Sequence, residues 1–401
     1  MDRGEIRDAS SVSWGGCLGG LFPVGTMSYY SGRRSIRPLA ASILVCQEHP
    51  PPDIRTIREG VVPMKRFSLL LQVLSLLIVI PVSGQATLYS AIHVFGDSLS
   101  DNGNVRLALL GGGIDALTPV PVSGNGFIPD LPYDRGAGLL PALSNGPNWI
   151  EDLSTSLLGA PVAPSLAGGS NHAFGGARMA ASDASAVPSV AEQVSGFLAA
   201  QTQPLDPDAL YVVWGGGNDV RDAAALTLGG GDPSSILAAY ADALQGAVGS
   251  LLAAGADYLL VPNIPDIGMT PAIRQYGDAA AAAVSLLTAG FNDLYNDVLD
   301  ALQLVHSEAR IIRLDTYRLL DQVVASPASF GLSDADNACA ASVDCIADPD
   351  GHFFWDGIHP TAAGHALIAA AALRAVPEPS VPLLLLIGLG VLFRVRRPRM
   401  A

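Results

Sequence analysis

Lysine is absent between residues 87 and 376, and the same stretch has only nine arginines against 30 acidic residues. Its formal net charge is therefore −21, a value that the basic ends of the chain reduce to −15 for the whole sequence. A body this acidic repels phosphate backbones, which disfavours nucleic acid as a partner. Net charge carries no information about the fold.

Cysteine is also scarce, with four in 401 residues. Cys17 and Cys46 precede a segment that we expect to be removed, which leaves Cys339 and Cys345. In an exported protein, two cysteines this close together predict a disulfide that closes a short loop. Their spacing is not CxxC and no second pair exists, which disfavours a metal site, so we expect neither a metal nor a cofactor.

Long hydrophobic runs occur only near the two ends of the chain. Residues 64–86 combine a basic Met-Lys-Arg start, an apolar run and small residues, a pattern that predicts a secretory signal peptide. A permanent membrane anchor is the alternative. Because signal peptides are N-terminal, we expect Met64 to be the true initiator and residues 1–63 to be a non-native extension, or else a disordered one.

Residues 377–401 contain a Pro-Glu-Pro turn, a 13-residue apolar run and an arginine cluster. As a helix the run would rise roughly 20 Å, short of the ~30 Å hydrocarbon core but long enough for transient insertion. The segment resembles the PEP-CTERM sorting signal of Gram-negative bacteria, with an ordinary tail anchor as the alternative. That resemblance implies an exosortase as a processing partner, in addition to the signal peptidase that the predicted signal peptide requires. It also implies an inner-membrane intermediate on the way to the cell surface or extracellular matrix.

Between these ends, residues 87–376 alternate short apolar runs with Ala/Leu-rich stretches. Such runs suit strands that are buried on both faces of a parallel sheet, and strands alternating with helices indicate a doubly wound α/β domain. We therefore expect one domain with a long loop at residues 111–148. The expected strands are 91–95, 211–214, 258–261 and 311–314, and the clearest helices are 234–254, 279–304 and 362–375.

Ser98 stands directly after the first expected strand, in the run FGDSLSD. A serine at the start of a helix beyond a strand exposes its hydroxyl at the sheet edge, where helix N–H groups can stabilise an anion. The run therefore makes Ser98 a candidate nucleophile. A simple N-cap serine is the alternative.

Asp356 and His359 stand in the run DGIH near the end of the domain. Histidine is the usual base for a serine near pH 7, and a carboxylate three residues before it can fix its tautomer. The alternative is a loop aspartate followed by a surface histidine.

Two Gly/Asn segments complete the set of candidate site residues. Residues 215–219 (GGGND) follow the second strand, and the Asn218 amide can donate to an oxyanion. In residues 171–177 (NHAFGGA), a glycine allows a backbone N–H to approach the same position. Turns that require positive φ are the alternative for both segments.

In chain order, at residues 96–98, 171–176, 216–219 and 356–359, the four motifs resemble those of the GDSL or SGNH hydrolase family. The resemblance implies a three-layer, flavodoxin-like parallel sheet of about five strands with helices on both faces. It implies Ser98 as nucleophile, His359 as base and Asp356 as the residue that orients it. The oxyanion hole would consist of the Ser98 N–H, the Gly176 N–H and the Asn218 amide, with Gly175 as an alternative to Gly176.

The expected function is therefore an exported serine ester hydrolase, an esterase, lipase or acylhydrolase, acting on a lipid or an acylated carbohydrate. A polysaccharide O-deacetylase or acyltransferase on the same fold is an alternative, as is a non-catalytic surface or matrix protein. The loop at 111–148 is a candidate wall of an acyl pocket through Phe127, Ile128, Leu131, Leu139 and Leu140. We expect His93 to be a core residue and His172, His306, His352 and His365 to be surface or supporting residues.

Overall fold

The computed structural model describes residues 89–110, 124–136, 138–182 and 185–376. The chain divides into two units, Met1–Ile80 and Pro81–Ala401, and every element described below belongs to the second. The predicted extension, signal peptide and sorting signal, together with Cys17 and Cys46, lie outside the described residues. They stay predictions.

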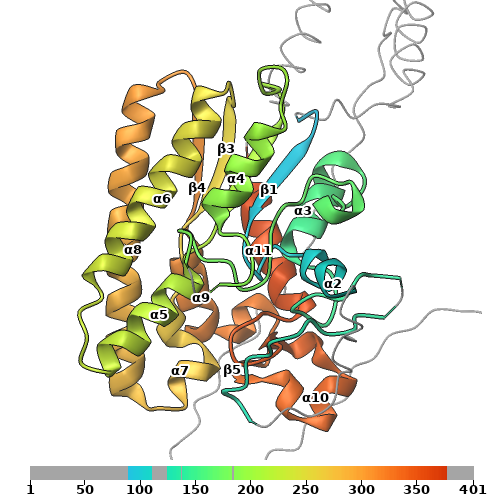
Figure 1. Ribbon diagram of the computed structural model, residues 1–401. Helices are drawn as coiled ribbons and strands as arrows, with labels where there is room; N and C mark the ends of the chain where they lie inside the picture. The colour runs from blue at the N-terminus through green and yellow to red at the C-terminus, as the bar shows by residue number, and fades with distance from the viewer. Residues whose placement is uncertain (1–88, 111–123, 137, 183–184, 377–401) are drawn as a thin grey trace, which may run out of the picture. The chain divides into compact units, whose positions relative to one another are not determined.

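Four parallel strands in sequential order form the main sheet (Figure 1). Each predicted strand is confirmed to within one residue at either end. All five residues of the second strand are buried, as expected for a strand covered on both faces. The strands are β1 (Ile92–Gly96), β2 (Leu210–Trp214), β3 (Tyr258–Pro262) and β4 (Arg310–Leu314).

A fifth, rudimentary strand runs along the free edge of β1. The N–H of Val94 donates to the carbonyl of Ser170 (3.0 Å), and the N–H of His172 donates back to the carbonyl of Val94 (2.7 Å). Val94 and Asn171 form a parallel bridge. Counting this segment, the strand order becomes second, first, third, fourth, fifth, which is the flavodoxin-like order. The predicted sheet of about five strands is confirmed.

Helices cover both faces of the sheet, which confirms the three-layer architecture (Figure 1). Helices α3 and α11 pack on one face, and α4, α6 and α8 pack on the other. The three helices predicted from the sequence correspond to α6, α8 and α11. The helices are α2 (Asn104–Leu109), α3 (Trp149–Leu158), α4 (Val190–Ala199), α5 (Gly217–Leu228), α6 (Ser234–Ala253), α7 (Pro271–Arg274), α8 (Asp278–Val305), α9 (Thr316–Ala325), α10 (Val343–Ala347) and α11 (Ala362–Ala375).

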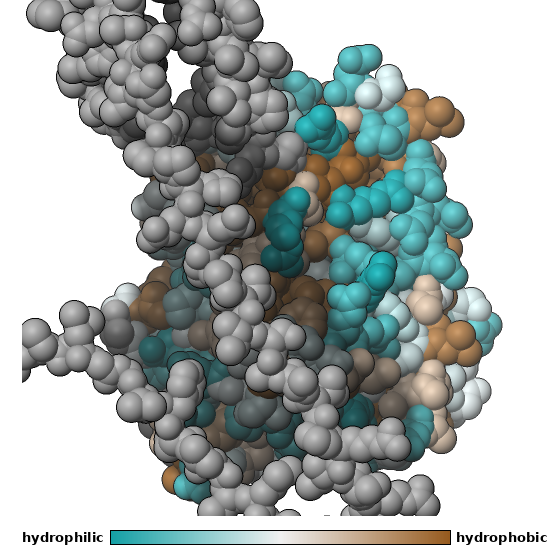
Figure 2. Space-filling model, turned by 180° about the vertical axis from the view of Figure 1, so that it is seen from behind, coloured by the Kyte–Doolittle hydropathy of each residue, from teal (hydrophilic) through white to brown (hydrophobic). Residues whose placement is uncertain are grey.

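Successive residues of a strand point to opposite faces of the sheet, and each face has its own hydrophobic core. Val213 of β2 packs toward α6 and α8, whereas its neighbours Val212 and Trp214 pack toward α3 and α11. The Trp214 ring meets the ring of Trp149 edge to face, with 5.1 Å between their centroids. Alternate residues of β2 thus contribute to the two cores on opposite faces of the sheet. Seen from behind, hydrophilic side chains gather on the right-hand side of the view, with some hydrophobic ones between them (Figure 2).

The described part of the 111–148 loop is held by a buried ion pair. Arg135 Nη1 lies 2.6 Å from Glu151 Oε2, and the Arg135 side chain is fully buried. The same guanidinium donates to the carbonyls of Leu140 and Gly146. Because Glu151 also caps α3 by accepting the N–H of Asn148, the ion pair fastens the loop to the first turn of that helix.

A second, smaller sheet pairs β5 (Asp334–Ala338) with β6 (His352–Phe354) in parallel. It lies beside α9 and leads directly into the Asp356–His359 segment. This arrangement brings the end of the domain back to the carboxyl edge of the main sheet.

His365 makes folding stability depend on pH. Its side chain in α11 is 1% exposed, and burial lowers its pKa from 6.5 to about 3. Between these two values the unfolded chain binds one more proton than the folded chain, so the His365 contribution is intact above pH 6.5. It falls by about 1.4 kcal/mol for each pH unit below that, until about pH 3.

We therefore expect His365→Leu to remove this slope. The measurement is urea unfolding of the wild type and the variant at several pH values from 4 to 7. As the pH falls across this range, the unfolding free energy of the wild type should decrease relative to that of the variant. A difference that is constant with pH would contradict the prediction.

Candidate active site

Ser98 lies in a tight turn beyond the carboxyl end of β1. The turn is closed by hydrogen bonds from the N–H groups of Ser100 and Asp101 to the carbonyl of Asp97. The prediction that Ser98 begins a helix is wrong, because α2 starts six residues later, at Asn104. The cause is the Asp101 carboxylate, which accepts the N–H groups of Gly103, Asn104 and Val105 and delays helix formation to that point.

The Asp356–His359 segment places an imidazole directly over this turn. His359 Nε2 lies 2.9 Å from Ser98 Oγ. On the other side of the ring, His359 Nδ1 lies 2.8 Å from Asp356 Oδ2. Both Asp356 and His359 are buried, at 0% and 4% exposure. The structure thus brings together the candidate residues of two motifs that lie far apart in the sequence.

Asp356 is fixed by more than the imidazole. Its Oδ1 accepts the backbone N–H groups of Ile358 and His359, each at 2.9 Å. Its Oδ2 accepts a hydrogen bond from the hydroxyl of Tyr133, at 3.2 Å. Burial raises the pKa of Tyr133, and the Asp356 carboxylate raises it further, so the phenol keeps its proton and acts as the donor.

Sequence reasoning did not find Tyr133. It lies 223 positions from Asp356, in a loop without a recognisable pattern, so no local signal marks it. The same loop also supports the site through its backbone, since the Gly357 N–H donates to the Phe127 carbonyl at 2.7 Å.

The candidate oxyanion donors lie at the ends of neighbouring strands. Among the described residues, the N–H groups of Ser98 and Gly176 have no hydrogen-bond acceptor. The Gly175 N–H, in contrast, donates to Asp101 Oδ2 at 2.8 Å. Gly176 has a φ of +82°, a conformation that side chains rarely adopt. Of the two glycines, Gly176 is therefore the one with a donor free to bind an anion.

Asn218 stands in the first turn of α5, directly after β2. Its Nδ2 donates to the carbonyl of Ala177 (2.9 Å), and its Oδ1 accepts from Arg221 Nη1 (3.2 Å). These two contacts fix the amide so that its second N–H hydrogen is left over for a ligand. The turn between β2 and α5 requires glycine at position 216, because φ there is +112° and a Cβ would lie 2.6 Å from Ile264 Cδ1.

A buried polar network joins the nucleophile turn to the 170–176 segment. Asn171 Nδ2 donates to the Ser100 carbonyl and to Asn102 Oδ1. Asn104 Nδ2 donates back to the carbonyls of Asn171 and Ala173. Because each of these buried amides is paired, the network fixes the distance between Ser98 and Gly176.

Burial raises the pKa of two aspartates near the site, Asp97 and Asp219, to about 6 each. Desolvation is the main cause for both. Backbone N–H groups, from Leu99 to Asp97 and from Met179 to Asp219, partly offset it. Both carboxylates are therefore ionised at neutral pH and hold their turns through these bonds.

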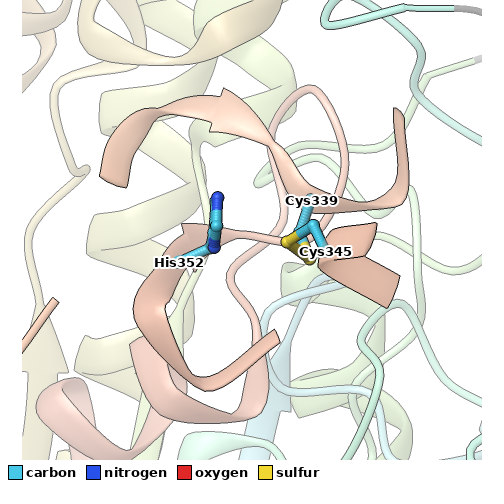
Figure 3. Close-up of side chains that lie close together, drawn as sticks. All are labelled: Cys339, Cys345 and His352. Atoms are coloured by element: carbon cyan, nitrogen blue, oxygen red, sulfur yellow. A yellow bond between two sulfur atoms is a disulfide. The ribbon is translucent and has the colours of Figure 1, made fainter. Parts of the chain in front are cut away.

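The structure joins Cys339 and Cys345 by a disulfide, with 5.2 Å between their Cα atoms. His352 lies beside it (Figure 3). The three residues offer ligand atoms within 4.8 Å of one another. Metals bind the thiolate form, so two sulfurs bonded to each other are not available as ligands.

The remaining histidines lie away from Ser98 Oγ. His93 lies in β1, is half buried and stacks on Tyr211, and His172 stacks on Phe95. His306 directly follows α8, and His365 is buried in α11.

A pocket opens beside Ser98, His359 and Asn218. The expectation that the 111–148 loop lines it is wrong for the described part of that loop. The walls come instead from the ends of β1 and β2, from α9 and from the residues around β6. Two residues of the described part of the loop, Tyr133 and Phe127, instead form hydrogen bonds with Asp356 and Gly357.

The hydrogen bond from Tyr133 predicts a measurable effect on Ser98. We expect Tyr133→Phe to lower the rate at which a fluorophosphonate labels Ser98 by about tenfold, because Asp356 loses a donor and holds His359 less well. The readout is the second-order labelling rate with peptide mapping. Tyr295→Phe is the matched control, since its hydroxyl bonds the Val261 carbonyl in the core. Equal labelling of wild type and Tyr133→Phe would refute a positioning role.

The chain is similar in sequence to known lipases, esterases and acyltransferases. A sequence model of the GDSL-like lipase/acylhydrolase family matches residues 92–372. The chain is 28% identical to Lipase 1 of Photorhabdus luminescens, over 73% of this chain and 50% of that protein. It is 32% identical to esterase EstA of Pseudomonas aeruginosa, over 70% and 46%. It is 25% identical to the phosphatidylcholine-sterol acyltransferase of Aeromonas hydrophila, over 71% and 89%.

The chain spans about half the length of the first two of these relatives. The family match, in contrast, extends from β1 to α11 of this chain and includes all four motifs. The hydrogen-bonded residues Ser98, His359 and Asp356 lie within it. The protein belongs to the GDSL-like lipase/acylhydrolase family.

Proposed function

We propose that this protein is a serine hydrolase that cleaves carboxylic esters through an acyl-enzyme on Ser98. The observation that carries the proposal is the continuous hydrogen-bonded path from Ser98 Oγ through the His359 ring to Asp356, at 2.9 and 2.8 Å. A serine hydroxyl is a weak nucleophile, and this arrangement supplies the base and the orienting group that activate it.

In the first half-reaction, Ser98 Oγ attacks the ester carbonyl while His359 Nε2 takes its proton. The tetrahedral intermediate then collapses, the bond to the alcohol breaks, and His359 delivers the proton to the leaving oxygen. In the second half-reaction, water attacks the acyl carbon while His359 takes its proton. The bond from the acyl group to Ser98 Oγ then breaks, and His359 returns the proton to Ser98 as the carboxylic acid leaves. Asp356 keeps the Nδ1–H in place throughout and stabilises the imidazolium.

The negative charge on the intermediate would be met by three donors, the N–H groups of Ser98 and Gly176 and the free N–H of Asn218. All three are held before substrate binds, by the nucleophile turn, the Asn171 network and the Ala177 carbonyl. Preorganised donors need no rearrangement during the reaction, which is why they contribute strongly to rate.

These roles predict distinct losses of activity with p-nitrophenyl acetate. Ser98→Ala should lower kcat by at least about 10³-fold, because the nucleophile is gone. Asn218→Ala should lower kcat by roughly 10²–10³-fold with a smaller change in KM, since its donor acts on the intermediate more than on the substrate. The conservative Asn218→Asp variant keeps the shape without the donor and should resemble Asn218→Ala. Hydrolysis by Ser98→Ala at the wild-type rate would reject the proposal.

The acyl acceptor need not be water. One relative of this chain is named a phosphatidylcholine-sterol acyltransferase, and a polysaccharide O-deacetylase would use the same acyl-enzyme. The acyltransferase would pass the acyl group from Ser98 to an alcohol, whereas the O-deacetylase would pass it to water and differ only in the ester that it accepts. Product analysis with and without an added alcohol separates hydrolysis from transfer.

We also propose that the protein is exported, through a signal peptide at residues 64–86 and a sorting signal at 377–401. The supporting features are the two terminal sequence patterns and a cysteine pair that is placed to form a disulfide. A signal peptidase and an exosortase would be the processing partners, with a membrane-inserted intermediate before release to the surface or matrix.

Export predicts that the secreted protein lacks residues 64–86. Blocking transport across the inner membrane should leave a longer form that retains them. The measurement is N-terminal sequencing or intact mass of the cell-associated and secreted forms. A secreted form with an unshortened N-terminus would show that the signal-peptide interpretation is wrong.

A further inference from the structure

The pocket beside Ser98 is enclosed by apolar side chains. It extends from the catalytic serine between the carboxyl ends of β1 and β2 on one side and α9 and β6 on the other. Apart from the catalytic groups, its walls consist mainly of carbon, contributed by Leu99, Trp214, Ile267, Leu319, Phe354 and Ile368. A group that enters the pocket from Ser98 Oγ therefore meets almost only hydrocarbon.

Most polar side-chain atoms in these walls are already engaged, including Asp97 Oδ1, which accepts the Leu99 N–H at 3.0 Å. Trp214 Nε1 donates to the carbonyl of Asn263 (2.9 Å), and Thr270 Oγ1 donates to the carbonyl of Ile267 (2.7 Å). The Thr316 hydroxyl likewise donates to Asn263. A sugar ring would lose its hydrogen bonds to water here without replacement, whereas an alkyl group would not. The pocket therefore suits the acyl side of the ester and leaves the alcohol outside.

The cavity volume is small, at about 50 Å³. Sites for drug-sized ligands measure roughly 300–1,000 Å³, and about 10–15 Å³ of such volume holds one water molecule. On this scale the pocket accommodates only a handful of heavy atoms. We propose that the site selects short acyl groups, of about two to four carbons, and excludes long fatty acyl chains. This inference rests on the proposed ester hydrolysis and specifies its substrate class.

Leu319 is one of the apolar side chains that line the pocket. It lies on the first turns of α9, half buried, and packs against two separate core clusters, one under the sheet and one around β6. The start of α9 is fixed, because Asn263 Oδ1 accepts the N–H groups of both Thr316 (2.7 Å) and Tyr317 (3.0 Å). The wall that limits acyl length is therefore part of an anchored helix.

A larger apolar groove, of about 470 Å³, lies between α5, α7 and α8. Its lining includes Ile273, Tyr276 and Leu286 but neither Ser98 nor His359. It therefore does not enlarge the space that the acyl group reaches from the nucleophile. A long acyl chain would have to leave the Ser98 pocket to use this groove.

The test compares kcat/KM for p-nitrophenyl acetate, butyrate, octanoate and palmitate with the full chain. We expect a fall of at least about tenfold between butyrate and octanoate, because even one excess methylene in a closed apolar pocket costs about tenfold or more. Leu319→Ala should reduce this fall by about tenfold, since it opens the wall. Leu319→Phe should do the reverse and lower butyrate hydrolysis relative to acetate.

Leu332→Ala is the matched control. Leu332 is a buried leucine of the same cluster around β6 but does not line the pocket, so its variant should keep the wild-type chain-length profile. Fluorophosphonate labelling of Ser98 counts the folded active sites in each preparation, which separates lost folding from changed selectivity.

Two results would overturn the chain-length inference but leave the proposed ester hydrolysis standing. One is Ser98-dependent hydrolysis of octanoate or palmitate that is as fast as that of butyrate. The other is an unchanged profile in both Leu319 variants. If the wild type and Ser98→Ala instead hydrolyse every ester at the same background rate, the proposed function fails and the chain-length inference fails with it.

Discussion

The hydrogen bond between His359 Nε2 and Ser98 Oγ joins two groups that are 261 positions apart in the chain. Everything else in the site supports this contact. The parallel sheet places Ser98 beyond its carboxyl edge, and the return of the chain through β6 places His359 above it. In open α/β sheets, a crevice forms at this edge where the strand order reverses. Here the reversal lies at β1, and the nucleophile follows that strand directly.

The strands and the residues of the four motifs could be predicted from the sequence. Buried parallel strands appear as short apolar runs, and Ser98, His359 and Asn218 each follow a strand or stand in a compact motif. Tyr133 and Leu319 could not be found this way, since their importance comes from contacts across the fold. The error at Ser98 has a local cause, because an aspartate side chain competed with the helix for backbone N–H groups.

The electrostatics of the site follow from the composition of the domain. Four carboxylates near the site are buried, those of Asp97, Asp101, Asp219 and Asp356. In a domain without lysine, their charge is balanced largely by hydrogen-bond donors rather than by cations. Asp101 alone accepts four backbone N–H groups. Such bonds are directional, so each carboxylate also fixes the shape of the turn that it binds.

The order of these groups along the chain has a consequence for biosynthesis. Ser98 is made early, whereas β6, Asp356 and His359 come from the last tenth or so of the described domain. A nascent or truncated chain that ends before this return holds its nucleophile without a base. Under the proposed chemistry such a chain is inert toward the ester bonds of the cell that makes it, and reactivity at Ser98 reports that synthesis and folding of the whole domain are complete.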